Sequence, residues 1–160
     1  PDLHIIHFDA HMDLRHDYLG EKLSHATVMR RCWELTGDGR IYQFGIRSGD
    51  REEYVWAKDH VHTSPFDFTG IEQAVAKLAG KPVYLTIDLD VLDPGIFPGT
   101  GTPEAGGVSF RQLIDALRQV AELNIVGADM NELSPHYDQS GISTALACKV
   151  LRELLLFLGK

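Results

Sequence analysis

Short apolar segments alternate with longer segments of helical periodicity along this chain, and this alternation limits the folds that it can adopt. The apolar segments are rich in Ile, Val, Tyr and Phe and predict strands at residues 3–8, 40–46, 83–87 and 125–130, with a weaker strand near 61–63. The periodic segments predict helices at residues 25–35, 51–60, 71–79, 110–123 and 142–158. Strands that alternate with helices are typical of a parallel sheet covered by helices, so we expect an α/β fold.

The chain shows no linker, internal repeat or shift in composition, which favours one compact domain for its 160 residues. The Gly- and Pro-dense segment at residues 93–107 predicts a single long loop between a strand and a helix. In open parallel sheets, ligand-binding groups gather at the carboxyl ends of the strands and in the loops that follow. Residues that directly follow a predicted strand are therefore the first candidates for a site.

Composition excludes several classes of protein. A formal net charge of −8 without a cluster of Lys or Arg argues against nucleic acid and anionic membrane as partners. No apolar run approaches the roughly 18 residues that span a bilayer, and we expect no secretory signal because no basic region precedes an apolar one at the start. Cys32 and Cys148 lack the spacing of a zinc or redox motif, which favours a reducing, cytoplasmic location.

Two clusters of metal-ligand side chains follow two of the predicted strands. Asp9, His11 and Asp13 occupy alternate positions after the first strand, so an extended chain points all three to one side. Asp88 and Asp90 follow the strand at 83–87 in the same way. A single aspartate after a strand is usually a turn residue or a helix N-cap, but two such clusters on strand ends favour a metal centre.

The charge and chemistry of these donors indicate the kind of metal. Aspartates crowded together raise one another's pKa unless cations cancel their charge, and two divalent ions would cancel four carboxylates. A donor set dominated by oxygen, with no thiolate, favours Mn²⁺ or Mg²⁺ over a structural Zn²⁺. Two ions held close together can share an activated water molecule as a nucleophile.

Five segments of the chain together resemble the ureohydrolases, the family of arginase, agmatinase and their relatives. In order they are HFDAHMDLR, SHATVMRR, FGIRSGDREEY, TIDLDVLDPGIFPGTGTPEAGG and GADMNELSPHYDQSGISTALA. The segments at residues 47–54 and 98–107 look most like agmatinases. The resemblance implies a three-layer α/β/α sandwich with a parallel sheet, partial in this chain, and a pair of Mn²⁺ ions. It also implies a set of metal ligands in which Asp9 and Asp88 bridge the ions: Asp9, His11, Asp13, Asp88 and Asp90.

The resemblance further implies roles for loop residues. His25, in SHA, matches a histidine that shuttles a proton and binds substrate at the mouth of the active site, whereas the residues alone favour a helix N-terminal histidine after Ser24. The family usually has Gly where this chain has Ala26. Glu132 matches the glutamate that binds the guanidinium group, although most loop acids are simply solvated. Thr102 is expected to line the pocket.

Together, these expectations predict an enzyme that hydrolyses a small cationic guanidinium substrate. The expected reaction is the conversion of agmatine to putrescine and urea, and the expected assembly is a homo-oligomer. Asp90 is expected to accept a hydrogen bond or a proton in the reaction. Arginine, guanidinobutyrate and formiminoglutamate stay open as substrates of related ureohydrolases. The family carries a further metal histidine in a GGDH segment upstream of DAHMD, which residues 1–160 lack. We therefore expect the C-terminal part of a single ureohydrolase domain, and the alternative is a non-catalytic fragment that binds metal or self-associates.

The other polar residues receive structural interpretations. His4 and His7 lie on the first strand and are expected to pack against or cap the sheet. The charged residues of segment 47–52 are expected to form a cluster of surface ion pairs, each worth little.

Overall fold

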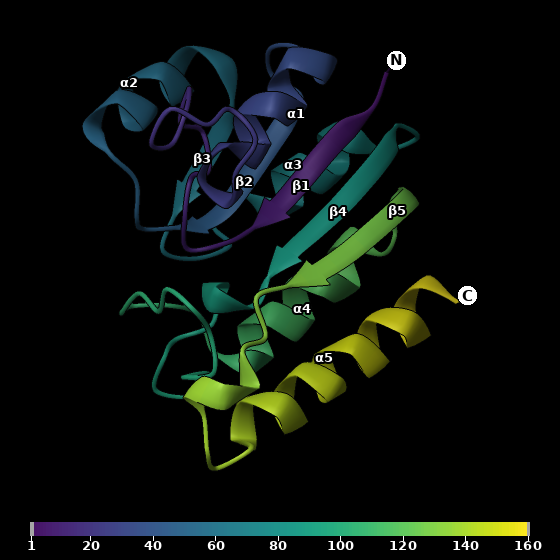
Figure 1. Ribbon diagram of the computed structural model, residues 1–160. Coiled ribbons are helices and arrows are strands. Elements are labelled where there is room, and N and C mark those ends of the chain that lie inside the picture. The colour runs from purple at the N-terminus through teal and green to yellow at the C-terminus, as the bar shows by residue number, and fades with distance from the viewer. Residues whose placement is uncertain (1, 160) are drawn as a thin grey trace.

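Five parallel strands form one sheet in the computed structural model, which describes residues 2–159 (Figure 1). Their order across the sheet is β3-β2-β1-β4-β5. The strands are His4–Phe8 (β1), Ile41–Ile46 (β2), His62–Pro65 (β3), Pro82–Asp88 (β4) and Asn124–Asn131 (β5). Because every neighbouring pair is parallel, the carboxyl ends of all the strands meet at one edge, and the loops that follow them converge there.

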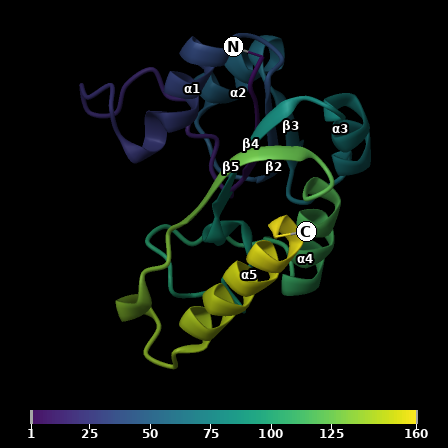
Figure 2. The same ribbon diagram turned by 90° about the vertical axis from the view of Figure 1, so that its right-hand side faces the viewer.

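Helices cover both faces of the sheet (Figures 1 and 2). They are Val28–Thr36 (α1), Arg51–His60 (α2), Ile71–Leu78 (α3), Phe110–Val120 (α4) and Ile142–Leu158 (α5). Helices α3, α4 and α5 bury apolar side chains against Ile6, Phe44 and Leu85 on one face. Helices α1 and α2 pack around Ile5 and Ile41 on the other face. The prediction of an α/β sandwich with a parallel sheet is confirmed.

The predicted elements are present, with differences at their ends. The helix expected at 25–35 begins as a 3-10 turn, His25–Thr27, before α1. Ser109 caps α4 as its position suggests, because its side chain accepts a hydrogen bond from the backbone N–H of Gln112. The weak strand is β3, shifted by one to two residues. Strand β5 is partly exposed rather than apolar on both faces, and within residues 2–159 it pairs with β4 alone.

The surface near β5 is partly open. Val126 on this strand is 57% exposed. A hollow of about 530 Å³ lies over this part of the sheet and is lined in part by Tyr84, Thr86 and Asp129.

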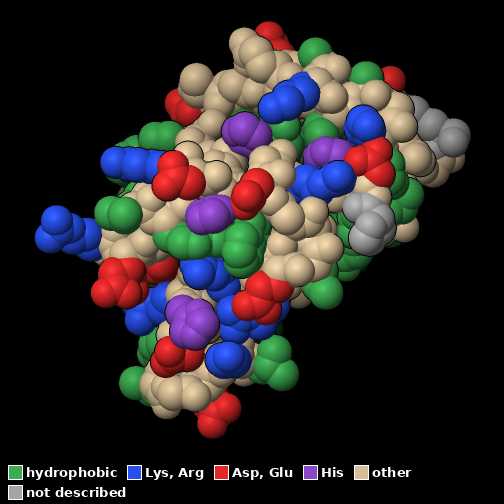
Figure 3. Space-filling view, turned by 90° about the horizontal axis from the view of Figure 1, so that it is seen from above, with side chains coloured by type: hydrophobic (Ala, Val, Ile, Leu, Met, Phe, Trp, Pro, Cys, Tyr) green, Lys and Arg blue, Asp and Glu red, His purple; other side chains and the backbone are tan. Residues whose placement is uncertain are grey.

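Acidic and basic side chains are interspersed on the face seen in Figure 3. None of the helices within residues 2–159 combines the length and apolar character required to cross a bilayer.

Candidate metal centre

The two predicted clusters lie side by side at the carboxyl edge of the sheet. Strands β1 and β4 are neighbours, and Phe8 pairs with Ile87 immediately before the first aspartate of each cluster. Asp88 ends β4, caps the 3-10 turn Leu89–Val91 (η2) and accepts a hydrogen bond from the backbone N–H of Asp90 in that turn. A cavity of about 480 Å³ lies at this edge, and all eight predicted site residues are among those that line it. They are Asp9, His11, Asp13, His25, Asp88, Asp90, Thr102 and Glu132.

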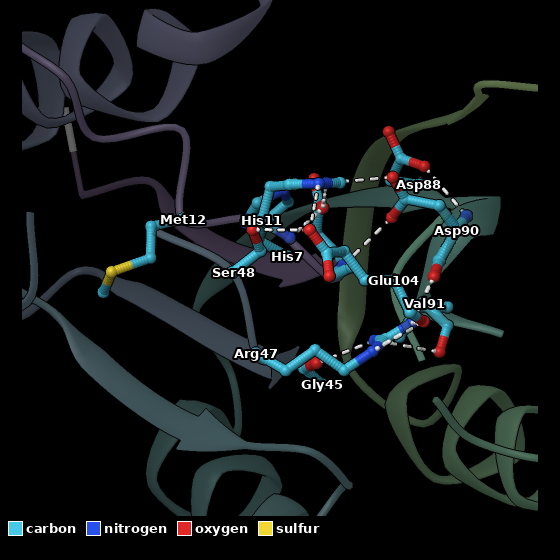
Figure 4. A network of polar contacts seen from close by, with 12 residues as sticks. His7, His11, Met12, Gly45, Arg47, Ser48, Asp88, Asp90, Val91 and Glu104 are labelled. Atoms are coloured by element: carbon cyan, nitrogen blue, oxygen red, sulfur yellow. Dashed lines mark hydrogen bonds and ion pairs between the residues drawn. The ribbon is translucent and has the colours of Figure 1, made fainter. Parts of the chain in front are cut away.

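Asp9 is the central residue of this cluster. Its Oδ2 lies 2.8 Å from Nε2 of His7, and its Oδ1 accepts a hydrogen bond from the backbone N–H of His11. Nδ1 of His11 lies 3.3 Å from Asp9 Oδ1 and 2.9 Å from Asp90 Oδ2 (Figure 4). The described residues form two groups of three donors, and within each group the donor atoms all lie within 4.8 Å of one another. One group is His7, Asp9 and Asp13, and the other is Asp9, His11 and Asp90. Asp9 belongs to both groups.

Burial of these carboxyl groups perturbs their pKa values. Burial, added to the negative charges of Asp9 and Asp90, raises the pKa of Asp88 to about 10. Burial and the charge of Asp9 raise the pKa of Asp13 to about 7. Burial alone would lower the pKa of His11, but its contacts with Asp9 and Asp90 outweigh burial and raise it to about 11. The cluster therefore cannot carry all of its carboxylate charges at neutral pH without a cation.

A buried oxygen of Asp90 faces an imidazole nitrogen in this cluster. Oδ2 of Asp90 is buried and lies 2.9 Å from Nδ1 of His11. With His11 protonated the two groups form an ion pair, and a divalent ion can take the place of that proton between the same two atoms. An imidazole nitrogen and carboxylate oxygens that converge in this way are ligands for a divalent ion. The residues present therefore fit a metal centre.

Two of the predicted site residues have an unusual backbone conformation. Asp13 has φ 54° and Glu132 has φ 66°, both in the left-handed region. Asp visits this region more readily than most residues, whereas Glu gains no local hydrogen bond from it. Each such residue costs about 1–3 kcal/mol, and strain of this kind concentrates at functional sites. The tertiary structure therefore holds Glu132 in a conformation that the isolated segment would avoid.

Three predicted residues lie at the mouth of the cavity. His25 begins the 3-10 turn before α1, and its ring makes a T-shaped contact with Tyr18 at a centroid distance of 5.3 Å. Glu132 directly follows β5, and Thr102 lies in the long loop between η2 and α4. The side chains of His25, Thr102 and Glu132 are exposed, so a small molecule in the cavity can reach them.

The prediction of surface ion pairs in segment 47–52 is wrong for Arg47. Arg47 is half-buried, and its guanidinium donates hydrogen bonds to the backbone carbonyls of Asp90 at 2.7 Å and Glu104 at 2.8 Å (Figure 4). Asp50 does pair with Arg15 at 3.5 Å, and it is also the N-cap of α2. Arg47 therefore ties the segment that carries a predicted metal ligand to the loop at 93–107. Sequence pattern missed this role because the acceptors belong to the main chain.

His7 is the member of the cluster that the sequence analysis missed. It was expected only to pack against or cap the sheet, but it is buried against Asp9. It precedes Asp9 by two positions on an extended strand, so both side chains point to the same face. That spacing is the signal that could have identified it.

Comparison with known proteins points to one family. The Arginase family model matches residues 1–157. The chain is 51% identical to the agmatinase of Bacillus subtilis (strain 168), a match that covers 98% of this chain and 55% of that protein. It is 35% identical to the guanidinobutyrase of Pseudomonas aeruginosa, with 96% and 52% covered. The chain therefore spans about half the length of the curated relatives that it matches.

Solved structures agree with this result. A candidate agmatinase from Clostridium difficile superimposes with a TM-score of 0.95 at 51% identity, over 98% of this chain and 58% of that one. The agmatine ureohydrolase of Thermoplasma volcanium superimposes with a TM-score of 0.86 at 35% identity, over 99% and 55%. The match of the family model over nearly the whole length and these close structural relatives lead to one conclusion. The chain belongs to the arginase family.

Proposed function

We propose that this chain carries the metal centre and the guanidinium-binding carboxylate of a binuclear manganese ureohydrolase that converts agmatine to putrescine and urea. One observation carries the proposal: one donor atom from each of Asp9, His11 and Asp90 lies within 4.8 Å of the other two, in the cavity at the carboxyl edge of the sheet. Donors arranged in this way suit a divalent cation. The 51% identity to a protein named agmatinase supports the choice of substrate.

The proposed ligands come from the ends of two neighbouring strands. The residues that would hold the ions are Asp9, His11, Asp13, Asp88 and Asp90, and Asp9 and Asp88 would each serve both ions. The set contains four carboxylates and a single imidazole. Among the divalent ions of the first transition row, such a set favours Mn²⁺. When bound, the ions cancel carboxylate charge and activate water as a nucleophile at neutral pH.

Glu132 is the proposed anchor of the substrate. A carboxylate can accept two parallel hydrogen bonds from a guanidinium group, which fixes the plane of that group as well as its position. The exposed side chain of Glu132 lies at the cavity mouth. Gly101 is its neighbour there, because a Cβ added to Gly101 would lie 3.5 Å from Oε2 of Glu132. Thr102 lines the same mouth and contributes a hydroxyl to the wall.

Two residues handle protons in the proposed reaction. Hydrolysis forms a bond between a water oxygen and the guanidinium carbon and breaks the bond to the alkyl nitrogen, which leaves as an amine and takes up a proton. His25, exposed at the mouth, can deliver that proton. Asp90 lies deeper in the cavity and accepts a hydrogen bond or a proton from the attacking oxygen.

Urea release from agmatine in the presence of Mn²⁺ tests the proposal. We expect urea and putrescine in equal amounts, and we expect Glu132→Gln to abolish most of the release while binding the same amount of Mn²⁺. The same assay with arginine and guanidinobutyrate, together with an assay for formamide release from formiminoglutamate, tests the substrate, and a strong preference for arginine would contradict agmatine. Absence of hydrolysis of every substrate, with at most one tightly bound ion, would overturn the proposal in favour of a non-catalytic metal-binding or self-associating chain.

A further inference from the structure

A row of polar side chains crosses the sheet two residues before the proposed metal ligands at the strand ends. The strand registers place one residue from each strand in this row: Thr63, Gln43, His7, Thr86 and Asp129. His7 and Thr86 precede Asp9 and Asp88 by two positions and therefore share their face of the sheet. Polar residues inside a sheet are costly unless they are hydrogen-bonded, so the bonds within this row indicate what it does.

Gln43 determines which nitrogen of His7 carries the donor hydrogen. The side chain of Gln43 is fully buried, and its amide nitrogen donates to the backbone carbonyl of Met12 at 2.7 Å. Its amide oxygen accepts a hydrogen bond from the hydroxyl of Thr63 at 3.4 Å. These two contacts fix the orientation of the amide and direct its second hydrogen at Nδ1 of His7, 3.1 Å away. Nδ1 therefore accepts, and the donor N–H of His7 is at Nε2.

The Nε2–H group of His7 points at the proposed bridging ligand. Nε2 lies 2.8 Å from Oδ2 of Asp9, and both residues are 2% exposed, so no water competes for this bond. The other oxygen of Asp9 faces His11. Both carboxylate oxygens of Asp9 are thus oriented by a directed hydrogen bond.

We propose that His7 is a positioning residue that orients the Asp9 carboxylate for metal binding through an Nε2–H donor imposed by Gln43. The proposal rests on the metal site proposed above. His7 is not itself a ligand in this arrangement, because its Nδ1 lone pair accepts from Gln43 and its Nε2 carries the hydrogen directed at Asp9. Partners that orient metal ligands in this way typically contribute a factor of about 10–100 in metal affinity.

The first test measures the tautomer of His7 in the metal-free chain. Long-range nitrogen–proton NMR correlations at pH 8 distinguish the two ring nitrogens. We expect a hydrogen on Nε2 and none on Nδ1. A hydrogen on Nδ1, alone or together with one on Nε2, would overturn the proposal. Because this measurement uses the unmodified chain without metal, it does not depend on the proposed activity or on the folding of any variant.

The second test compares Mn²⁺ binding in two variants by electron paramagnetic resonance of the free ion. His7→Gln places an amide N–H close to the position of Nε2 and keeps the donor, whereas His7→Leu has a similar size and no donor. We expect His7→Leu to weaken binding by about 10–100-fold and His7→Gln to retain most of the affinity. Equal losses in both variants, which packing or direct ligation would produce, or no loss in either would overturn the proposal. If the unmodified chain binds no Mn²⁺, the proposed function fails, and the tautomer still decides the donor role of His7.

Discussion

Addition of Mn²⁺ to the metal-free chain is expected to release protons, and the structure gives their number. The pKa of Asp88 is raised to about 10 and that of His11 to about 11, so each holds one proton at pH 7 before metal binds. Asp13, with its pKa raised to about 7, holds half a proton on average. Ligands must lose their protons to bind a metal, so these three groups together release about 2.5 protons per chain at pH 7.

The sign of the pH dependence follows from these raised pKa values. Protons and metal compete for the same atoms, so binding strengthens as the pH rises and weakens as it falls. The logarithm of the association constant changes by the number of protons released per pH unit, so one unit below pH 7 weakens binding by about 300-fold or more.

Isothermal titration calorimetry in buffers of different ionisation enthalpy measures the proton release directly. The slope of the observed heat against that enthalpy is the number of protons transferred to the buffer. Asp88→Asn is the matched variant for the metal-free chain: its neutral amide imitates the protonated carboxyl, so its acid–base titration should lack one group that loses its proton near pH 10. A heat that does not depend on the buffer would contradict proton release by the whole cluster, and an unchanged titration of Asp88→Asn would contradict the contribution of Asp88.

Three further predictions concern the residues that hold the site in place. Arg47→Met leaves the backbone carbonyls of Asp90 and Glu104 without their donor. It should lower the free energy of unfolding, measured in urea, by about 2–4 kcal/mol, and Arg47→Lys should lower it by less. Equal losses in the two variants would contradict a role for the planar guanidinium. Asp50→Ala removes the N-cap of α2 and should cost about 1 kcal/mol, most of which Asp50→Ser should restore; a loss in both alike would point away from capping. Gly45→Ala places a Cβ 2.5 Å from the Val91 side chain at φ 88° and should destabilise more than Gly80→Ala, which meets only the strain of φ 76°; similar thermal unfolding midpoints for the two would refute this clash.

Much of the fold could be predicted from the sequence because its signals are local. Apolar segments rich in Ile, Val, Tyr and Phe identified the strands, the 3.6-residue periodicity identified the helices, and the α/β alternation indicated a parallel sheet. The exposure of β5 could not be predicted in this way, since its segment has the apolar content of an interior strand and only the strand order places it at an edge. The metal cluster was predictable because alternate positions after a strand share one side, and both of its segments carry that spacing.

The sequence by itself determined the alternation of strands and helices, the two clusters at Asp9 and Asp88, and the resemblance to the ureohydrolases. Only the tertiary structure decided how those clusters are supported. The donor role of His7 depends on Gln43 and on the register between β1 and β2, which brings together residues 36 positions apart. The role of Arg47 depends on main-chain carbonyls, which every residue carries and no sequence pattern marks. Hydrogen bonds between distant segments are set by register and backbone direction, and for this reason they appear only once the chain is folded.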